Sequence, residues 1–422
     1  MKLGILPGSF VVGKIPSLVI VFVALLSAAC SSRNLRKHAT FPDAPVDRFL
    51  PSGTRTEFPA AGEDPVEFAT PVVTDHNYII PSETRGIEAR DRVLHSQRWH
   101  MPVANGVSSQ PLHDADTIYF GANDGYFYAV DADLGSVKWR YETKSPVYAQ
   151  ATVQKGRIYF VASDDVLYCL EQDTGRWVWH YKRTVSAGTT VRGNAVPLLD
   201  RDRALLGFSD GYFAALNAKD GNLLWETRIQ RNTKFMDVDA EAVIDGNQIF
   251  VASYDGGLYA LSRYNGRVLW FTDVGGSKKV LLDEREGSKD LFLPTSDGRV
   301  LSVNRETGKV NWAFELDLGT PTNVIAHGIH LVFGSSRQYL YVIRKGDGGL
   351  VYRFNAGMRS GFFGSPVVAP SGTGDEFFLY SNFGNLYGWR WRKDNAAARK
   401  HGILFDAGLR RRGAGTQAGQ GE

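Results

Sequence analysis

Several patterns that mark common classes of enzyme are missing from this chain of 422 residues. It has no Gly-x-Ser-x-Gly turn, no glycine-rich phosphate loop and no set of cysteines and histidines at zinc spacing. The nine histidines are scattered, and His327 and His330, three residues apart, fall in a predicted turn and strand. The net charge of +3 is small and spread out, which gives no electrostatic case for nucleic-acid binding. These absences favour a protein with no catalytic group, metal or cofactor.

Cysteine and helical periodicity are also scarce. The two cysteines are Cys30 and Cys169. Cys169 stands in the apolar run Leu167–Leu170 and is predicted to be a small core residue. No long segment repeats its apolar residues with the period of a helix, so the sequence predicts an all-β protein.

A repeat runs through the middle of the chain, in which a glycine is followed four residues later by a large aromatic residue. Successive glycines are 40 to 46 residues apart, and each unit holds short strands separated by tight turns such as Asn-Gly and Asp-Gly. A repeat of this length is typical of one blade of a β-propeller, with the aromatic residue packed between neighbouring blades. The pairs are Gly135/Trp139, Gly175/Trp179, Gly221/Trp225, Gly266/Trp270, Gly308/Trp312 and Gly348/Tyr352.

The number of blades follows from the flanks of these repeats. Upstream, Thr70 to Trp99 has the same order of strands and the terminal Trp. Downstream, Ser365 to Trp391 supplies three strands, and the missing fourth is predicted near Thr54 to Pro59, where it would close the ring. The sequence therefore predicts an eight-bladed β-propeller of four-stranded antiparallel blades. Seven blades is the alternative, if Thr70 to Trp99 is an appended arm.

Acidic residues recur at matched turn positions in the repeats. Because a catalytic pair is unique, recurrence in successive blades favours hairpin caps over catalysis. These residues are Asp124, Asp210, Asp255 and Asp297.

The N-terminus has the pattern of a targeting segment. Lys2 and Lys14 precede a short apolar stretch, and the small residues before Cys30 resemble the lipobox of bacterial lipoproteins. In that family a leucine usually stands three residues before the cysteine, where this chain has Ser27. The resemblance implies lipidation of Cys30, and Ser31 resembles the residue that follows in lipoproteins passed to the outer membrane. An ordinary signal peptide cut near Ala29 is the alternative.

These observations give a domain plan. Residues 1–29 are expected to be a lipoprotein signal peptide, and residues 30–65, rich in proline, threonine and charge, a lipidated cysteine and flexible tether. Residues 66–392 are expected to form the propeller. Residues 393–422, rich in alanine, glycine and arginine, are expected to be a disordered tail.

Two neighbouring repeats are longer than the others, and both are extended after the Trp strand. The extra residues lie in Arg183–Asn194 and Ile229–Asp239. Connections of the same kind emerge on the same face of a propeller, and function concentrates on loops carried by a rigid scaffold. The two segments therefore predict a docking surface on one face.

The repeat resembles that of two known families. The spacing of its residues from Ala129 to Trp139 resembles that in the repeat of the quinoprotein dehydrogenases. Those enzymes hold pyrroloquinoline quinone in their propellers. Those enzymes carry a disulfide of adjacent cysteines beside the cofactor, and no two cysteines of this chain are near in sequence. The resemblance therefore implies the scaffold and not the cofactor.

The two extended segments resemble the BamB family, lipoproteins of the outer-membrane β-barrel assembly machinery. Thr189 to Pro197 is similar to the family's Leu-x-Leu-Arg-Gly segment, and Met236 to Ala240 to its Asp-Val-Asp segment. Thr189 and Val191 stand where the family has leucines, which implies a weaker apolar contact or a divergent partner. In that family the segments bind the POTRA region of BamA, the subunit that inserts barrels. The contacts implied for this chain are Thr189, Val191, Arg192, Asp237 and Asp239.

The BamB resemblance implies a non-enzymatic scaffold at the periplasmic face of the outer membrane. Its expected partners are a BamA-like subunit, the membrane through the lipid, and nascent outer-membrane proteins as a hypothesis. Two alternatives stay open, a generic interaction propeller at the cell envelope and a quinoprotein-like oxidoreductase. At residue level, Arg192 could instead pair with a neighbouring carboxylate, and Asp237 and Asp239 could cap a turn.

Overall fold

The computed structural model describes residues 49–57, 70–183, 195–229, 238, 240–253, 257–274, 278–358, 360–369 and 376–391. All of them belong to one compact unit that begins at Ala44. Each regular element among these residues is a β-strand, which confirms the all-β class.

The strands are numbered in chain order. The first sixteen are β1 (Phe49–Glu57), β2 (Val72–Val73), β3 (Asn77–Ser82), β4 (Gly86–Asp91), β5 (Gln97–Met101), β6 (Leu112–Asp114), β7 (Thr117–Gly121), β8 (Tyr126–Asp131), β9 (Val137–Glu142), β10 (Thr152–Gln154), β11 (Arg157–Val161), β12 (Val166–Glu171), β13 (Trp177–Lys182), β14 (Leu198–Asp200), β15 (Arg203–Gly207) and β16 (Tyr212–Asn217). The others are β17 (Leu223–Arg228), β18 (Val243–Asp245), β19 (Gln248–Ala252), β20 (Gly257–Ser262), β21 (Val268–Asp273), β22 (Leu281–Leu282), β23 (Asp290–Pro294), β24 (Arg299–Asn304), β25 (Val310–Glu315), β26 (Ile325–His327), β27 (His330–Gly334), β28 (Tyr339–Arg344), β29 (Leu350–Asn355), β30 (Val367–Val368), β31 (Glu376–Tyr380) and β32 (Asn385–Trp391).

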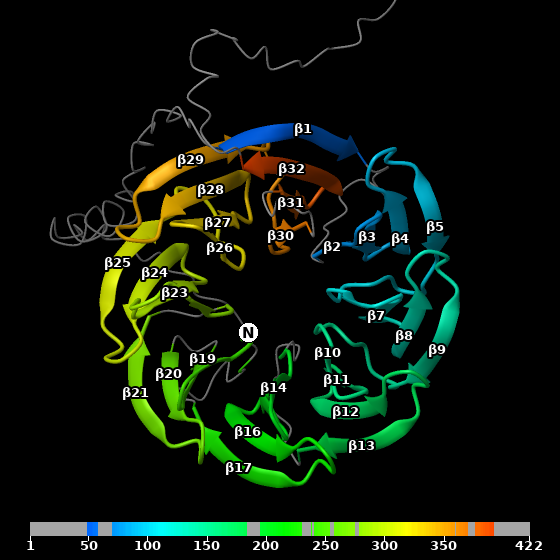
Figure 1. Ribbon diagram of the computed structural model, residues 1–422, viewed down its shortest axis with the longest axis horizontal. Coiled ribbons are helices and arrows are strands. Elements are labelled where there is room, and N and C mark those ends of the chain that lie inside the picture. The colour runs from blue at the N-terminus through cyan, green and yellow to red at the C-terminus, as the bar shows by residue number, and fades with distance from the viewer. Residues whose placement is uncertain are drawn as a thin grey trace, which may run out of the picture. The chain divides into compact units, whose positions relative to one another are not determined.

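The strands form eight antiparallel sheets of four strands each, arranged in a ring (Figure 1). Seven sheets use four consecutive strands, from β2–β5, called blade 1, to β26–β29, called blade 7. Blade 8 has the order β1-β32-β31-β30. The count confirms eight blades, because the segment from Thr70 to Trp99 forms blade 1 and is not an appended arm.

The ring is closed by pairing of its two chain ends. Strand β1 pairs antiparallel with β32, from Phe49 opposite Trp391 to Glu57 opposite Asn385. The predicted closure by an N-terminal strand is confirmed, although the strand begins five residues before Thr54. It lies inside residues 30–65, so part of the segment expected as a tether belongs to the propeller. Pairing the ends protects the ring against opening at one seam.

The recurring tryptophans lie between blades, as the sequence predicts. Trp99 of blade 1, for example, packs in one core cluster with Ile118, Phe120 and Val130 of blade 2. The indole N–H of five of these residues donates to a backbone carbonyl of the next blade, so a large apolar contact carries a satisfied polar atom. The donor and acceptor pairs are Trp99 and Ala132, Trp139 and Gln172, Trp179 and Ala218, Trp270 and Arg305, and Trp312 and Lys345.

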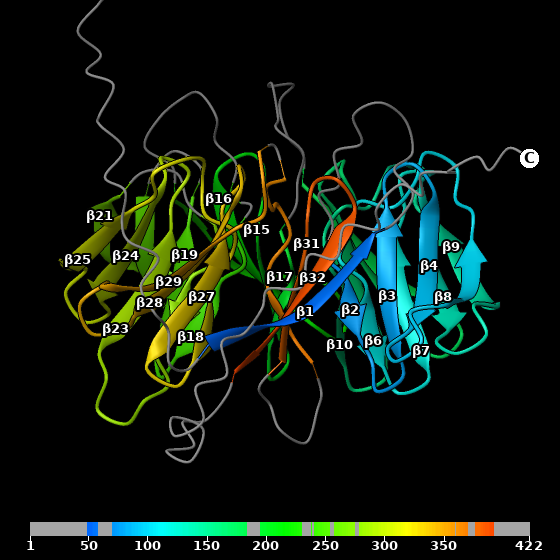
Figure 2. The ribbon, with the colours of Figure 1, turned by 90° about the horizontal axis from the view of Figure 1, so that it is seen from above.

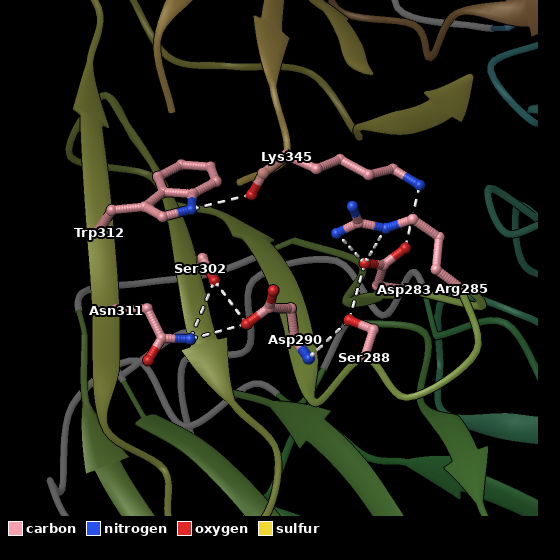
Figure 3. A network of polar contacts seen from close by, with 8 residues as sticks. All are labelled: Asp283, Arg285, Ser288, Asp290, Ser302, Asn311, Trp312 and Lys345. Carbon is pink, nitrogen blue, oxygen red and sulfur yellow. Dashed lines mark hydrogen bonds and ion pairs between the residues drawn. The ribbon is translucent and has the colours of Figure 1, made fainter. Parts of the chain in front are cut away.

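A buried ion pair joins blades 6 and 7 at the junction held by Trp312 (Figure 3). Lys345 Nζ lies 3.0 Å from Asp283 Oδ1, and the two residues are 4% and 1% exposed. Arg285 Nε and Ser288 Oγ donate to the other carboxylate oxygen at 2.7 and 2.8 Å. Burial would raise the pKa of Asp283, but these donors outweigh it and hold that pKa well below its ordinary value.

Antiparallel strands place the connections of the blades on two opposite faces. The turns between second and third strands, and the linkers to the next blade, lie on what we call the linker face. The turns between first and second and between third and fourth strands lie on the turn face. Figure 2 shows the strands running between these two faces. Because Phe49 pairs with Trp391 at the end of β32, the chain enters β1 on the turn face.

Candidate docking site on the linker face

Of the seven linkers that lead from blade 1 in turn to blade 8, two are longer than the other five. One connects β13 to β14 through residues 183–197, and the other connects β17 to β18 through residues 229–242. They flank blade 4, and both begin and end on the linker face. The candidate contact residues Thr189, Val191, Arg192, Asp237 and Asp239 lie outside the described residues, as does Cys30. What the structure describes is how the ends of the two linkers are held.

The first linker begins with a partly buried arginine. Arg183 Nε donates to Asp210 Oδ2 at 2.7 Å, and its Nη1 donates to Glu226. The guanidinium carbon lies 4.4 Å from the ring centre of Tyr212, within range of a cation–π contact. Burial would lower the pKa of Arg183, but Glu226 and Asp210 outweigh it and raise that pKa. Blade 4 therefore fixes the point where the linker leaves blade 3.

The second linker is held at both ends by the same part of blade 4. The Ile229 N–H donates to the Gly211 carbonyl at 2.9 Å, and the Val238 N–H to the Phe208 carbonyl at 3.3 Å. Both Ile229 and Val238 have fully buried side chains in the core cluster between blades 4 and 5. A Cβ on Gly207 would lie 2.2 Å from the Val238 carbonyl oxygen, so this close approach requires glycine.

One turn therefore contacts both linkers. Residues 208–211 connect β15 to β16; Asp210 binds the first linker, and Phe208 and Gly211 bind the second. Ser209, in the same turn, donates two hydrogen bonds to the carboxylate of Asp165 in blade 3, one from its N–H at 3.3 Å and one from its hydroxyl. Burial raises the pKa of Asp165, and the bonds from Ser209 oppose that shift without cancelling it.

Only some of these residues could be recognised from the sequence. The expected role of acidic turn residues as caps is confirmed for Asp124, whose carboxylate accepts the Tyr126 N–H at 3.0 Å, while Asp255 lies outside the described residues. Asp210 makes a longer bond of this kind, 3.4 Å to the Tyr212 N–H, and also binds Arg183. The sequence marks Arg183 only as the first residue of an extended segment. Nothing in the sequence indicates that it pairs with Asp210 and Glu226.

Other features offer little chemistry. In the described part of the chain, no group of three or more His, Cys, Asp or Glu residues is placed to hold a metal ion. Cys169 is fully buried, as predicted for a core residue, and burial raises its pKa to about 11, which leaves the thiol protonated and unreactive. A cavity of about 90 Å³ on the turn face is lined in part by Asp200 and Arg263, which form an ion pair with each other. No helix in the described ranges is long and apolar enough to cross a membrane.

Comparison with known proteins adds a family. The family model described as "Outer membrane protein assembly factor BamB" matches residues 85–314. BamB of Kangiella koreensis is 30% identical over 186 residues, which cover 42% of this chain and 47% of that protein. BamB of Escherichia coli K12 is 27% identical over 188 residues, covering 43% of this chain and 46% of that protein. The chain thus spans about half the length of the curated relatives it matches.

Solved structures support the fold. BamB from Moraxella catarrhalis superposes with a TM-score of 0.66 at 20% identity, covering 80% of this chain and 100% of that one. The quinohemoprotein alcohol dehydrogenase from Comamonas testosteroni gives a TM-score of 0.66 at 13% identity, covering 82% of this chain and 76% of that one. At these identities the likeness concerns the architecture alone.

Proposed function

The chain belongs to the family of the outer membrane protein assembly factor BamB, and on this premise we propose that it is a non-enzymatic scaffold of the outer-membrane β-barrel assembly machinery. It is held at the periplasmic face of the outer membrane by lipid on Cys30. It binds the POTRA region of a BamA-like subunit and assists insertion of nascent outer-membrane proteins.

The proposed docking surface consists of the two long linkers. The observation that carries it is the turn at residues 208–211, which contacts the ends of both linkers and so fixes their separation. Anchored loops lose less conformational entropy on binding than free ones, which favours recognition. Arg192 is the proposed centre of the contact, because a guanidinium offers planar donors and arginine is enriched among the residues that dominate interfaces.

Co-purification from detergent-solubilised envelope tests the proposal. We expect Arg192→Glu and Asp237→Lys to lower recovery of the BamA-like subunit. Matched charge reversals at exposed positions of the turn face, Lys219→Glu and Asp173→Lys, are the controls and should leave recovery unchanged. Undiminished recovery with both linker variants would remove the assignment.

The second candidate, a quinoprotein-like oxidoreductase, has the structural likeness to alcohol dehydrogenases in its favour. It lacks the pair of adjacent cysteines, since the sequence holds only Cys30 and Cys169. Incubation of the purified protein with calcium and pyrroloquinoline quinone separates the two candidates. A bound chromophore would favour the oxidoreductase, and its absence the scaffold.

A further inference from the structure

Two turns carry the most exposed apolar side chains of the turn face, ahead of Tyr264 in blade 5, 64% exposed, and Ile329 in blade 7, 53% exposed. In blade 1, Val93 is 83% and Leu94 is 74% exposed, and in blade 2, Leu134 is 73% exposed. All three lie in the turn between the third and fourth strands of the blade. Single exposed apolar residues are ordinary, but a pair of leucines at the same position of adjacent repeats is a pattern.

The repeat supplies its own comparison for this position. Leu134 directly precedes Gly135, which has φ +68°, and in blade 1 His95, with φ +55°, takes the place of that glycine after Leu94. The matched residue is polar in the five following blades, so the turn does not need a leucine. These residues are Thr174, Asp220, Asn265, Thr307 and Asp347.

Both turns are fixed in shape. The carboxylate of Asp91 accepts the N–H groups of Val93 and Leu94 at 2.8 Å each. In the same way Asp131 accepts the N–H of Leu134 at 2.9 Å. The backbone is thus held by its own hydrogen bonds, and the leucine side chains are left pointing at solvent without a packing role.

The turn of blade 1 contacts blade 8, through which the chain enters the propeller. Arg92, next to Val93, lies 3.4 Å from Glu376 of blade 8, and Asn77 of blade 1 donates to Asp133 of blade 2 at 3.3 Å. Blade 8 is also the blade whose outer strand begins at Phe49 on the turn face. The chain from Cys30 to Phe49 spans at most about 65 Å when fully extended.

We propose that Val93, Leu94 and Leu134 rest on the surface of the lipid bilayer that holds the anchor. This inference depends on the proposed lipidation of Cys30. A few apolar side chains bind a bilayer weakly by themselves, but a tether raises their local concentration at its surface. The contact turns the linker face away from the membrane, toward a periplasmic partner, with blades 1 and 2 nearest the lipid and blades 5 and 6 farthest.

Fluorescence quenching in vesicles tests this orientation. The full-length lipidated protein is reconstituted in phosphatidylethanolamine and phosphatidylglycerol vesicles that carry a nitroxide on some headgroups, with no partner present. A fluorophore is attached to one introduced cysteine at a time, because lipidated Cys30 has no free thiol and Cys169 is buried. The test positions are Leu94→Cys and Leu134→Cys. The controls are Thr307→Cys, at the matched turn across the ring, and Asp164→Cys, exposed on the linker face.

We expect at least threefold stronger quenching at positions 94 and 134 than at 164, with 307 between them. Equal quenching at 94, 134 and 164 would overturn the orientation. Leu134→Asp should weaken the quenching of a label at position 94, and Leu94→Asp that of a label at position 134, whereas Thr307→Asp should change neither. Unchanged quenching in both leucine variants would also overturn the proposal.

Two readouts separate this inference from the proposed function. Flotation of the same vesicles tests the anchor, and its failure would overturn both ideas. Recovery of the BamA-like subunit by Leu94→Asp with Leu134→Asp tests the alternative that these leucines bind that subunit. Loss of recovery with unchanged quenching would overturn the bilayer contact while leaving the scaffold in place.

Discussion

Gly175 lies against the indole of Trp139, the tryptophan of the preceding blade. A Cβ at Gly175 would be 2.5 Å from Trp139 Cε3, and the glycine has φ +67°. The glycine of each repeat therefore serves two purposes: it allows the positive φ of its own turn, and it leaves room for the indole of the preceding blade. This is why glycine and tryptophan recur together.

Replacing Gly175 with alanine should lower the free energy of unfolding far more than the same replacement in a turn with no neighbouring indole. Gly156, in the same blade, has φ +69° with nothing within 4 Å of an added Cβ. Gly156→Ala should cost about 1 kcal/mol from backbone strain alone. Gly175→Ala should cost a further ~1–3 kcal/mol from the clash with the indole. Thermal unfolding of both variants measures the difference, and equal melting temperatures would contradict the packing account.

The buried pair of Asp283 and Lys345 predicts a second asymmetry. Asp283→Ala leaves the ammonium of Lys345 buried without its carboxylate, so unfolding free energy should fall by about 3–5 kcal/mol. Asp347→Ala, which breaks the exposed pair with Arg344, is the control and should change the melting temperature little. A similar small effect for both variants would show that the buried pair does not hold blades 6 and 7 together.

The residues that the sequence predicted are those whose role recurs. The packing roles of Trp139 and Gly175 could be predicted because the same pair of residues recurs in several blades. The pairing of Asp283 with Lys345 occurs once, across 62 residues, and nothing in the sequence marks it. The first residues of β1 were missed for a different reason, since Pro51 cannot donate to a sheet and the register shifts between Pro51 and Arg55.

Asp165 predicts a pH dependence of stability. Burial raises its pKa above the ordinary value of 3.8, so the folded protein binds this proton more tightly than the unfolded chain does. The contribution of Asp165 to the free energy of unfolding is therefore most favourable below pH 3.8, and it falls as the pH rises through the folded-state pKa. Asp165→Asn should be more stable than the native chain at neutral pH, with the difference shrinking toward pH 4. Melting temperatures of both proteins across pH measure this, and a less stable variant at neutral pH would contradict it.

Arg183 is predicted to position the first linker. Arg183→Met removes the ion pairs with Asp210 and Glu226, and should lower the unfolding free energy by about 1–2 kcal/mol. It should also weaken binding of the BamA-like subunit several-fold, because the linker loses its fixed starting point. Lys182→Ala removes an exposed charge beside it and should change neither. Stability and affinity are measured separately, and a loss of stability with unchanged affinity would restrict Arg183 to a structural role.

The affinity of the purified protein for the isolated POTRA region of the BamA-like subunit tests the central claim most directly. The claim is that the two long linkers on either side of blade 4 form one docking surface. Arg192→Glu and Asp237→Lys should each raise the Kd by about 30-fold or more, corresponding to ~2 kcal/mol, while Lys219→Glu and Asp173→Lys on the turn face leave it unchanged. A native Kd for both linker variants, or an equal loss with the turn-face variants, would contradict the account.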